Sequence, residues 1–141
     1  LLSTLTFLWG ALVAGFKAGL IYNTFPLMGD RLIPEDFLYL EPLWRNFIEN
    51  PSAIQWTHRL LALTTLVYTW VLIRNYFKKD AQSASLSALQ LLGGLSLIQV
   101  FLGILTLIHM VPVTLGALHQ LTGVIFVVTT GLLFQKRLNT R

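Results

Sequence analysis

The chain has 141 residues, of which 55% are hydrophobic and only 11% are charged, and its mean hydropathy is +0.67. This composition excludes an ordinary soluble domain and predicts an all-α membrane protein. The net charge of +4 does not indicate nucleic-acid binding, because the basic residues stand at the ends of apolar segments and not on a polar face. There is no cysteine, so any chemistry must come from histidine, carboxylate or a bound cofactor.

Four apolar segments, at about 2–22, 54–77, 86–108 and 115–135, are each long enough to cross a hydrocarbon core of about 30 Å. The first has no methionine or basic region before it, so we interpret it as a membrane span and not a signal peptide, in a chain that is part of a longer one. The connections KKDAQSAS and HMVPVT are short, which favours antiparallel neighbours. The sequence therefore predicts one domain over 1–141, a four-transmembrane-helix antiparallel bundle.

The remaining segment, 23–53, is rich in proline, acidic residues and aromatics, as expected of an ordered loop at a membrane surface. Basic residues instead flank the second connection and follow the last span: Arg74, Lys78, Lys79, Lys136, Arg137 and Arg141. The basic bias predicts that this face is cytoplasmic and that the loop 23–53 lies outside. We expect a multi-pass protein of the bacterial cytoplasmic (inner) membrane. Gly15 and Gly19 form a GxxxG pair, which would permit close packing of the first span.

Two histidines stand inside the predicted spans, where an ionisable side chain is costly and indicates a functional site. His58 lies about one turn into the second span and His119 about one turn into the fourth, and both spans start on the outer side. Each lies on a stripe of small residues: Ala62 and Thr65 near His58, Gly116 and Gly123 near His119. Two imidazoles at one depth, with room between the helices, favour axial ligation of a heme iron.

Other interpretations of these residues remain open. An intramembrane histidine also serves as a core residue that is hydrogen-bonded to a neighbouring helix, as do amides such as Gln55, Gln99 and Gln120. A zinc or copper site would need a third ligand. His109 is the candidate, but it stands in the connection HMVPVT, where a histidine facing water is the simpler interpretation.

Two cations lie at about the same predicted depth as the histidines. Lys17 is about one turn from the outer end of the first span, and Arg59 follows His58 directly. Both are candidate cofactor-binding residues, because a cation can pair with a heme propionate and arginine offers a two-pronged donor. The alternative is that both side chains extend to the membrane surface.

Three stretches carry a more specific pattern: YNTFPLMG at 22–29, NFIENP followed by QWTHR within 46–59, and VP followed by LHQ within 111–120. In order and spacing these resemble the C-terminal half of heme A synthase, over nearly the whole chain. The resemblance implies an eight-helix membrane oxidoreductase built from two similar four-helix halves. Such an enzyme oxidises a methyl group of heme O to the formyl group of heme A, a step in cytochrome oxidase assembly.

The resemblance also implies roles for particular residues. Each half of the family carries a histidine pair, and the positions that match here are His58 and His119, as axial ligands of heme b. The N-terminal half has a catalytic glutamate three residues before its first histidine, whereas this chain has Gln55 there. Glutamine cannot act as a general base, so we expect no catalytic residue in this half. The implied partners are the N-terminal half of the enzyme or a second copy, heme O, membrane lipid and an unidentified electron partner, without nucleic acid.

Three other functions remain open at this point. One is a freestanding bis-histidine membrane cytochrome b that transfers electrons. Another is a half-length synthase acting as a homodimer, which Gln55 disfavours because neither copy would supply the glutamate. The last is a structural four-helix membrane bundle without a cofactor.

Overall fold

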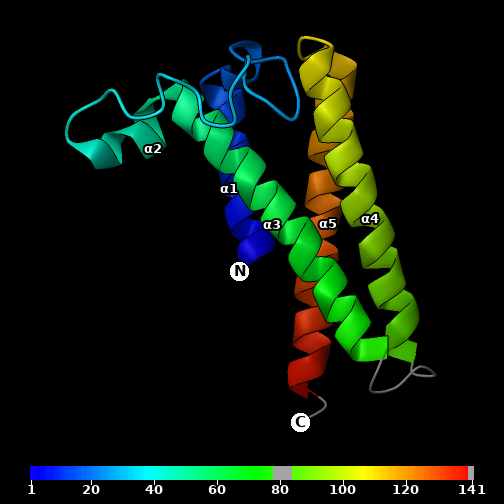
Figure 1. The fold of residues 1–141 in the computed structure, drawn as a ribbon. Helices are drawn as coiled ribbons and strands as arrows, with labels where there is room; N and C mark the ends of the chain where they lie inside the picture. Colours follow the sequence, from blue (N-terminus) through cyan, green and yellow to red (C-terminus); the bar gives the residue numbers. More distant parts are fainter. Residues whose placement is uncertain (78–83, 140–141) are drawn as a thin grey trace.

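The computed structural model describes residues 1–77 and 84–139, and within these ranges the chain is all α (Figure 1). The elements in chain order are α1 (Leu2–Gly15), η1 (Ala18–Leu20), η2 (Leu43–Arg45), α2 (Asn46–Glu49), α3 (Pro51–Phe77), α4 (Ala84–Ile108) and α5 (Val113–Asn139). The predicted spans 54–77, 86–108 and 115–135 lie inside α3, α4 and α5. The described residues form no strand, only an isolated bridge between Met28 and Arg31.

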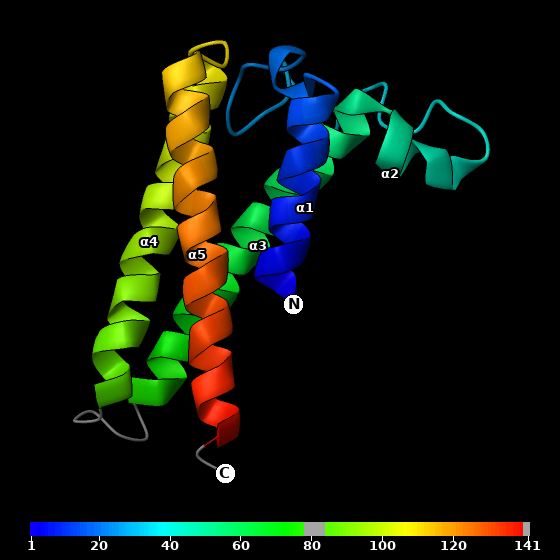
Figure 2. The ribbon, with the colours of Figure 1, turned by 180° about the vertical axis from the view of Figure 1, so that it is seen from behind.

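The four longer helices alternate in direction along the chain (Figures 1 and 2). Helix α3 is inclined to the others and packs against both α1 and α4, while α4 and α5 pack side by side. Contact between α1 and α5 is less extensive than these three pairings. The space between the α1–α3 pair and the α4–α5 pair is therefore where a cavity can form.

The prediction of a continuous first span over 2–22 is wrong in its second part. Helix α1 ends at Gly15, and Lys17 adopts a left-handed conformation with φ 51°. A left-handed residue just past a helix end closes its last turn and redirects the chain. Gly15 and Gly19 therefore do not lie on one helix, so they form no GxxxG surface. The 14 residues of α1 span only about 21 Å at about 1.5 Å per residue.

The redirected chain packs against the turn between α4 and α5. Gly19 lies so close to this turn that an added Cβ would stand 3.0 Å from Cγ2 of Val111. The side-chain amide of Asn23 donates to the carbonyls of Gly19, at 2.7 Å, and Leu107, at 2.9 Å. These contacts hold η1 to the end of α4, which explains why the first span breaks where it does.

Two helices in the described ranges are long and apolar enough to cross a membrane, over Ala88–Ile108 and Val113–Leu133. Only 22% and 11% of the residues in the most apolar stretches of these two helices are buried inside the protein. Helix α1 is a shorter apolar helix. Lys78, Lys79 and Arg141, on which the predicted orientation partly rests, lie outside the described residues.

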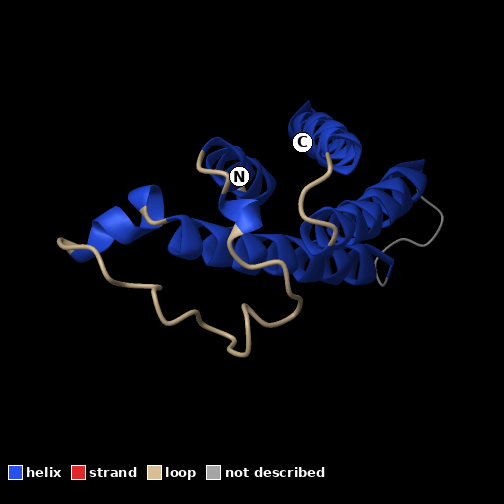
Figure 3. Ribbon diagram, turned by 90° about the horizontal axis from the view of Figure 1, so that it is seen from above, coloured by secondary structure: helices blue, strands red, loops and turns tan. Residues whose placement is uncertain are grey.

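The loop 23–53 is ordered by polar contacts and contains η2, α2 and the start of α3. Seen from above, it reaches well to one side of the long helices (Figure 3). Asn50 precedes Pro51, and its Oδ1 accepts the backbone N–H of Ser52 at 2.9 Å, which caps the N-terminus of α3. The start of α3, and with it the position of His58, is therefore fixed by the loop.

Candidate heme-binding site

A cavity of about 900 Å³ lies between α1, α3, α4 and α5. Its volume falls within the range of about 300–1,000 Å³ that is typical of small-molecule and cofactor sites. His58 and His119 both line it, and so do the residues of their predicted small-residue stripes: Ala62, Thr65, Gly116 and Gly123. His109 is exposed, binds the carbonyl of Leu105 through Nδ1 at 2.9 Å, and is not among the lining residues.

His58 is oriented by helix α1. Its Nδ1 lies 3.2 Å from the backbone carbonyl of Thr6. A carbonyl oxygen only accepts hydrogen bonds, so Nδ1 carries the proton and Nε2 keeps its lone pair. The ring lies against Gly10, where an added Cβ would stand 3.0 Å from Cε1. An imidazole whose Nδ1–H is held by a carbonyl is prepared to bind a metal through Nε2.

His119 is held differently, by α4. Its ring lies against Gly103, and its backbone carbonyl accepts the amide of Gln99 at 3.0 Å. The hydroxyl of Thr122 donates to the same Gln99 side chain, so this amide joins α4 to α5. Nδ1 of His119 is buried without a hydrogen-bond partner. Across the described residues, Nε2 of His58 and Nε2 of His119 both lack a hydrogen bond to protein.

Arg59 lines the cavity, but its guanidinium is engaged by the loop. It donates to the carbonyls of Thr24, Leu27 and Tyr22 at 2.9, 3.2 and 2.9 Å. Its Nε is buried and has no partner, so one donor is left for a ligand. Lys17, the other predicted cation, is exposed and also lines the cavity.

Gln55 is 3% exposed and lies on the same face of α3 as Arg59. Its amide donates to the carbonyl of Tyr22 at 2.9 Å, whereas its Oε1 has no partner among the described residues. The carbonyl of Tyr22 thus receives donors from both Gln55 and Arg59. These two side chains fasten the segment that follows η1 over the start of α3.

Comparison with known proteins assigns the chain to a family. A family model described as "Cytochrome oxidase assembly protein" (COX15-CtaA) matches residues 1–130.

The chain belongs to this family.

Among its relatives, a protein named "Heme A synthase" from Wolbachia sp. subsp. Brugia malayi is 45% identical over 115 residues, which cover 81% of this chain and 32% of that protein. One named "Heme A synthase" from Brucella anthropi is 43% identical over 82% of the chain and 32% of its own length. "Heme A synthase COX15" of Arabidopsis thaliana is 41% identical over 95% of the chain and 29% of its own length. The chain therefore spans about a third of the length of these curated relatives. No solved structure matches it.

A family of this kind implies heme, and the cavity fits that group. Two imidazoles reach one largely apolar space from α3 and α5, and each has a ring nitrogen without a protein partner. A zinc or copper centre would need a third ligand. The described residues contain no group of three histidine, cysteine, aspartate or glutamate side chains that could hold a metal ion.

Several residues that shape the site were not predicted from the sequence. Gly103 and Thr6 contact the histidines from other helices, and Asn23 ties η1 to α4. Gly10 had a weak sequence signal, because it stands four residues before Ala14 in the same helix. The importance of the others depends on which helices become neighbours, and no local pattern encodes that.

Proposed function

We propose that this chain is the heme b-binding half of a heme A synthase, with His58 and His119 as the two axial ligands of one b-type heme. The observation that carries the proposal is that both histidines line the same cavity, each with a free ring nitrogen. The names and extents of the relatives support the assignment to a larger enzyme.

The two ligands define what this half contributes. A heme held by two imidazoles has no open position and supplies one-electron transfer. His58 and His119, each backed by a glycine, would hold the heme, and Gln55 cannot accept a proton as a base. We therefore place the oxidation of heme O in the other half of the enzyme, with no catalytic residue in this one.

The remaining donors at the cavity suit the propionate end of such a group. Arg59 keeps its buried Nε free, and Lys17 presents an ammonium group at the same cavity. Charge-assisted hydrogen bonds to a carboxylate are stronger than neutral ones and offset part of the burial cost. Because Arg59 also donates hydrogen bonds to three loop carbonyls, it would connect the loop to an occupied site.

For the membrane arrangement, we propose that α1 and α3 cross together with α4 and α5, as one four-helix antiparallel bundle over 1–141 in the bacterial inner membrane. The loop 23–53 would face the exterior. The proposed partners are the N-terminal half of the same enzyme or a second copy, membrane lipid, heme O as substrate and a separate electron partner.

The test is the visible and EPR spectrum of the purified full-length protein. We expect His58→Ala and His119→Ala each to abolish the low-spin bis-imidazole signal of one heme, and the matched control His109→Ala to retain it. An unchanged low-spin signal in both cavity variants would contradict the ligand assignment. Retained heme b in a full-length protein that forms no heme A would instead favour a freestanding cytochrome b.

A further inference from the structure

The segment η2–α2 carries an exposed apolar surface on the outside of the loop. Leu43, Trp44, Phe47 and Ile48 are 54%, 60%, 37% and 42% exposed. These are two adjacent pairs, four residues apart along the chain, so the four side chains lie on one side of the helical turns. Asn46 and Asn50, which are fully buried, occupy the opposite side. The segment is therefore amphipathic, with its apolar side turned away from the protein.

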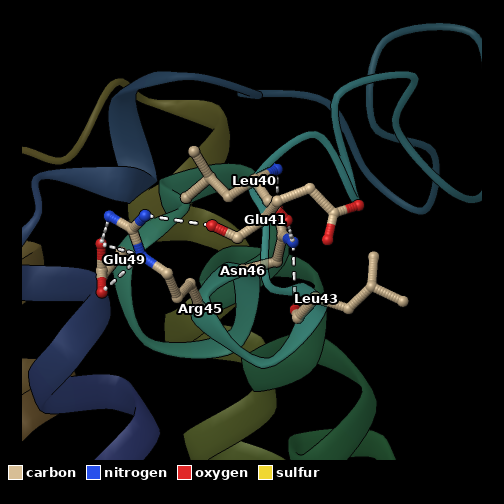
Figure 4. A network of polar contacts seen from close by, with 6 residues as sticks. All are labelled: Leu40, Glu41, Leu43, Arg45, Asn46 and Glu49. Atoms are coloured by element: carbon tan, nitrogen blue, oxygen red, sulfur yellow. Dashed lines mark hydrogen bonds and ion pairs between the residues drawn. The ribbon is translucent and has the colours of Figure 1, made fainter.

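A network of polar contacts fixes this orientation (Figure 4). Oδ1 of Asn46 accepts the backbone N–H groups of Tyr39 and Leu40 at 3.1 and 3.0 Å, and its amide donates to the carbonyls of Leu40 and Leu43 at 2.8 and 3.0 Å. Turning the apolar side inward would break these bonds, each of which contributes about 0.5–1.5 kcal/mol. The apolar side chains are thus held outward.

The position of the segment indicates what covers it. Figures 1 and 2 show η2 and α2 beside the first turns of α3, lower than the upper ends of α4 and α5. One of the two membrane-crossing windows starts at that upper end, at Val113. The segment therefore lies level with the outer part of the apolar helices and not beyond them. Amphipathic segments with exposed tryptophan at this level are typical of the membrane–water boundary.

The charges of this segment fit a lipid surface that need not contain anionic headgroups. Residues 39–50 contain one basic residue, Arg45, and its guanidinium is paired with Glu49 at 2.6 Å. Glu41 adds a second carboxylate, so the segment carries no net positive charge. Electrostatic attraction to acidic lipid would therefore contribute little, and burial of apolar area would dominate.

We propose that Leu43, Trp44, Phe47 and Ile48 insert into the boundary between headgroups and acyl chains of the outer leaflet and anchor the loop there. Asn50 and Pro51 connect this anchor directly to the start of α3. The anchor would therefore fix the depth in the membrane of the helix that carries His58. It requires that α4 and α5 cross the membrane and, for the outer leaflet, the proposed exterior orientation of the loop, and it does not depend on heme binding.

The experiment places a nitroxide on single cysteines at positions 44 and 48 of the full-length protein in phosphatidylcholine nanodiscs, with any cysteine outside this chain replaced by serine. EPR compares collision with oxygen, which enters lipid, and with a nickel chelate, which stays in water. Trp44→Cys and Ile48→Cys should favour oxygen, as should the lipid reference Val128→Cys. The matched control Glu41→Cys, on the same loop, should favour the nickel chelate.

Each other outcome would overturn the proposal in a recognisable way. Preference for the nickel chelate at both 44 and 48 would show that the surface faces water. Protection from both reagents would show that protein covers it, either the other half of the enzyme or a partner. If Val128→Cys also reported water, the membrane placement of α5 would be wrong, which distinguishes that failure from failure of the anchor alone.

Discussion

The imidazole of His119 on α5 lies directly against the backbone of Gly103 on α4, where a Cβ would stand 2.9 Å from Cε1 of the ring. His58 on α3 stands in the same relation to Gly10 on α1, at 3.0 Å. Each cavity histidine is therefore backed by a glycine of a neighbouring helix. The absence of a side chain at these two positions sets how far each ring can withdraw from the cavity.

We expect Gly103→Ala and Gly10→Ala to weaken heme binding without removing either ligand. The new methyl group must displace the ring, and overpacking of this kind costs about 1–3 kcal/mol, or roughly a tenfold to hundredfold loss of affinity. The measurement is heme content and the low-spin EPR signal of the full-length protein. Gly131→Ala is the matched control, because nothing lies within 4 Å of a Cβ there. Full occupancy with an unshifted spectrum in both variants would contradict a role for the glycines.

Replacement of Arg59 by lysine should loosen the loop that follows η1. Lysine keeps the charge but cannot reach the three carbonyls that the guanidinium binds, and hydrogen bonds to a charged group contribute about 1.5–3 kcal/mol each. We expect at least a roughly tenfold faster hydrogen exchange in residues 22–29. Arg31→Lys is the control, because its ion pair with Glu35 is largely exposed. Equal exchange in the two variants would show that Arg59 does not hold the loop.

The substitution Gln55→Ala should leave heme A formation by the full-length protein intact. Its side chain offers a neutral amide that cannot take a proton, and it makes one hydrogen bond, to Tyr22. Loss of that bond should lower the free energy of unfolding by about 1 kcal/mol. Heme A formation is assayed by pigment extraction alongside heme b content. Abolished heme A formation at unchanged heme b content would mean that this half takes part in the chemistry.

Asn46→Ala should release the outer loop while leaving the long helices in place. The change removes the acceptor of the N–H groups of Tyr39 and Leu40, and each lost hydrogen bond contributes about 0.5–1.5 kcal/mol. We expect increased hydrogen exchange at these two amides and a loss of oxygen preference for a nitroxide at position 44. Asn75→Ala, at an exposed position of α3, is the control and should change neither. An unaltered loop in Asn46→Ala would contradict the network.

The ion pair beside the anchor predicts a dependence on pH. Hydrogen bonds from Arg45 hold the pKa of Glu49 below its usual value, with a partly opposing effect of desolvation. A depressed carboxyl pKa contributes stability that is present above the ordinary pKa of about 4.3 and is lost as the pH falls through the lower folded value. The protection factors of the α2 amides, which correct for the pH dependence of intrinsic exchange, should therefore stay constant down to about pH 5 and fall below it. Arg45→Gln should return the pKa of Glu49, followed by carboxyl NMR, toward its ordinary range.

The sequence by itself determined the helices that follow the loop and the pair of candidate ligands. Long apolar runs between short connections predict α3, α4 and α5, and they place His58 and His119 near corresponding ends of helices that run in the same direction. These features follow from local composition, from helical periodicity and from the antiparallel order that short connections impose. The three sequence stretches within 22–29, 46–59 and 111–120 indicated the family. The comparison with known proteins then showed it.

Only the tertiary structure decided how the chain holds those two residues. Thr6 and Gly103 contact the histidines because particular helices become neighbours, and neighbours distant in the chain leave no periodic signal. The break after Gly15 depends on contacts of η1 with the α4–α5 turn, which outweigh the apolar run that predicts a longer span. Arg59 was predicted only as a candidate for a propionate, and its hydrogen bonds to the carbonyls of the loop depend on the path of that loop, which the local sequence does not encode.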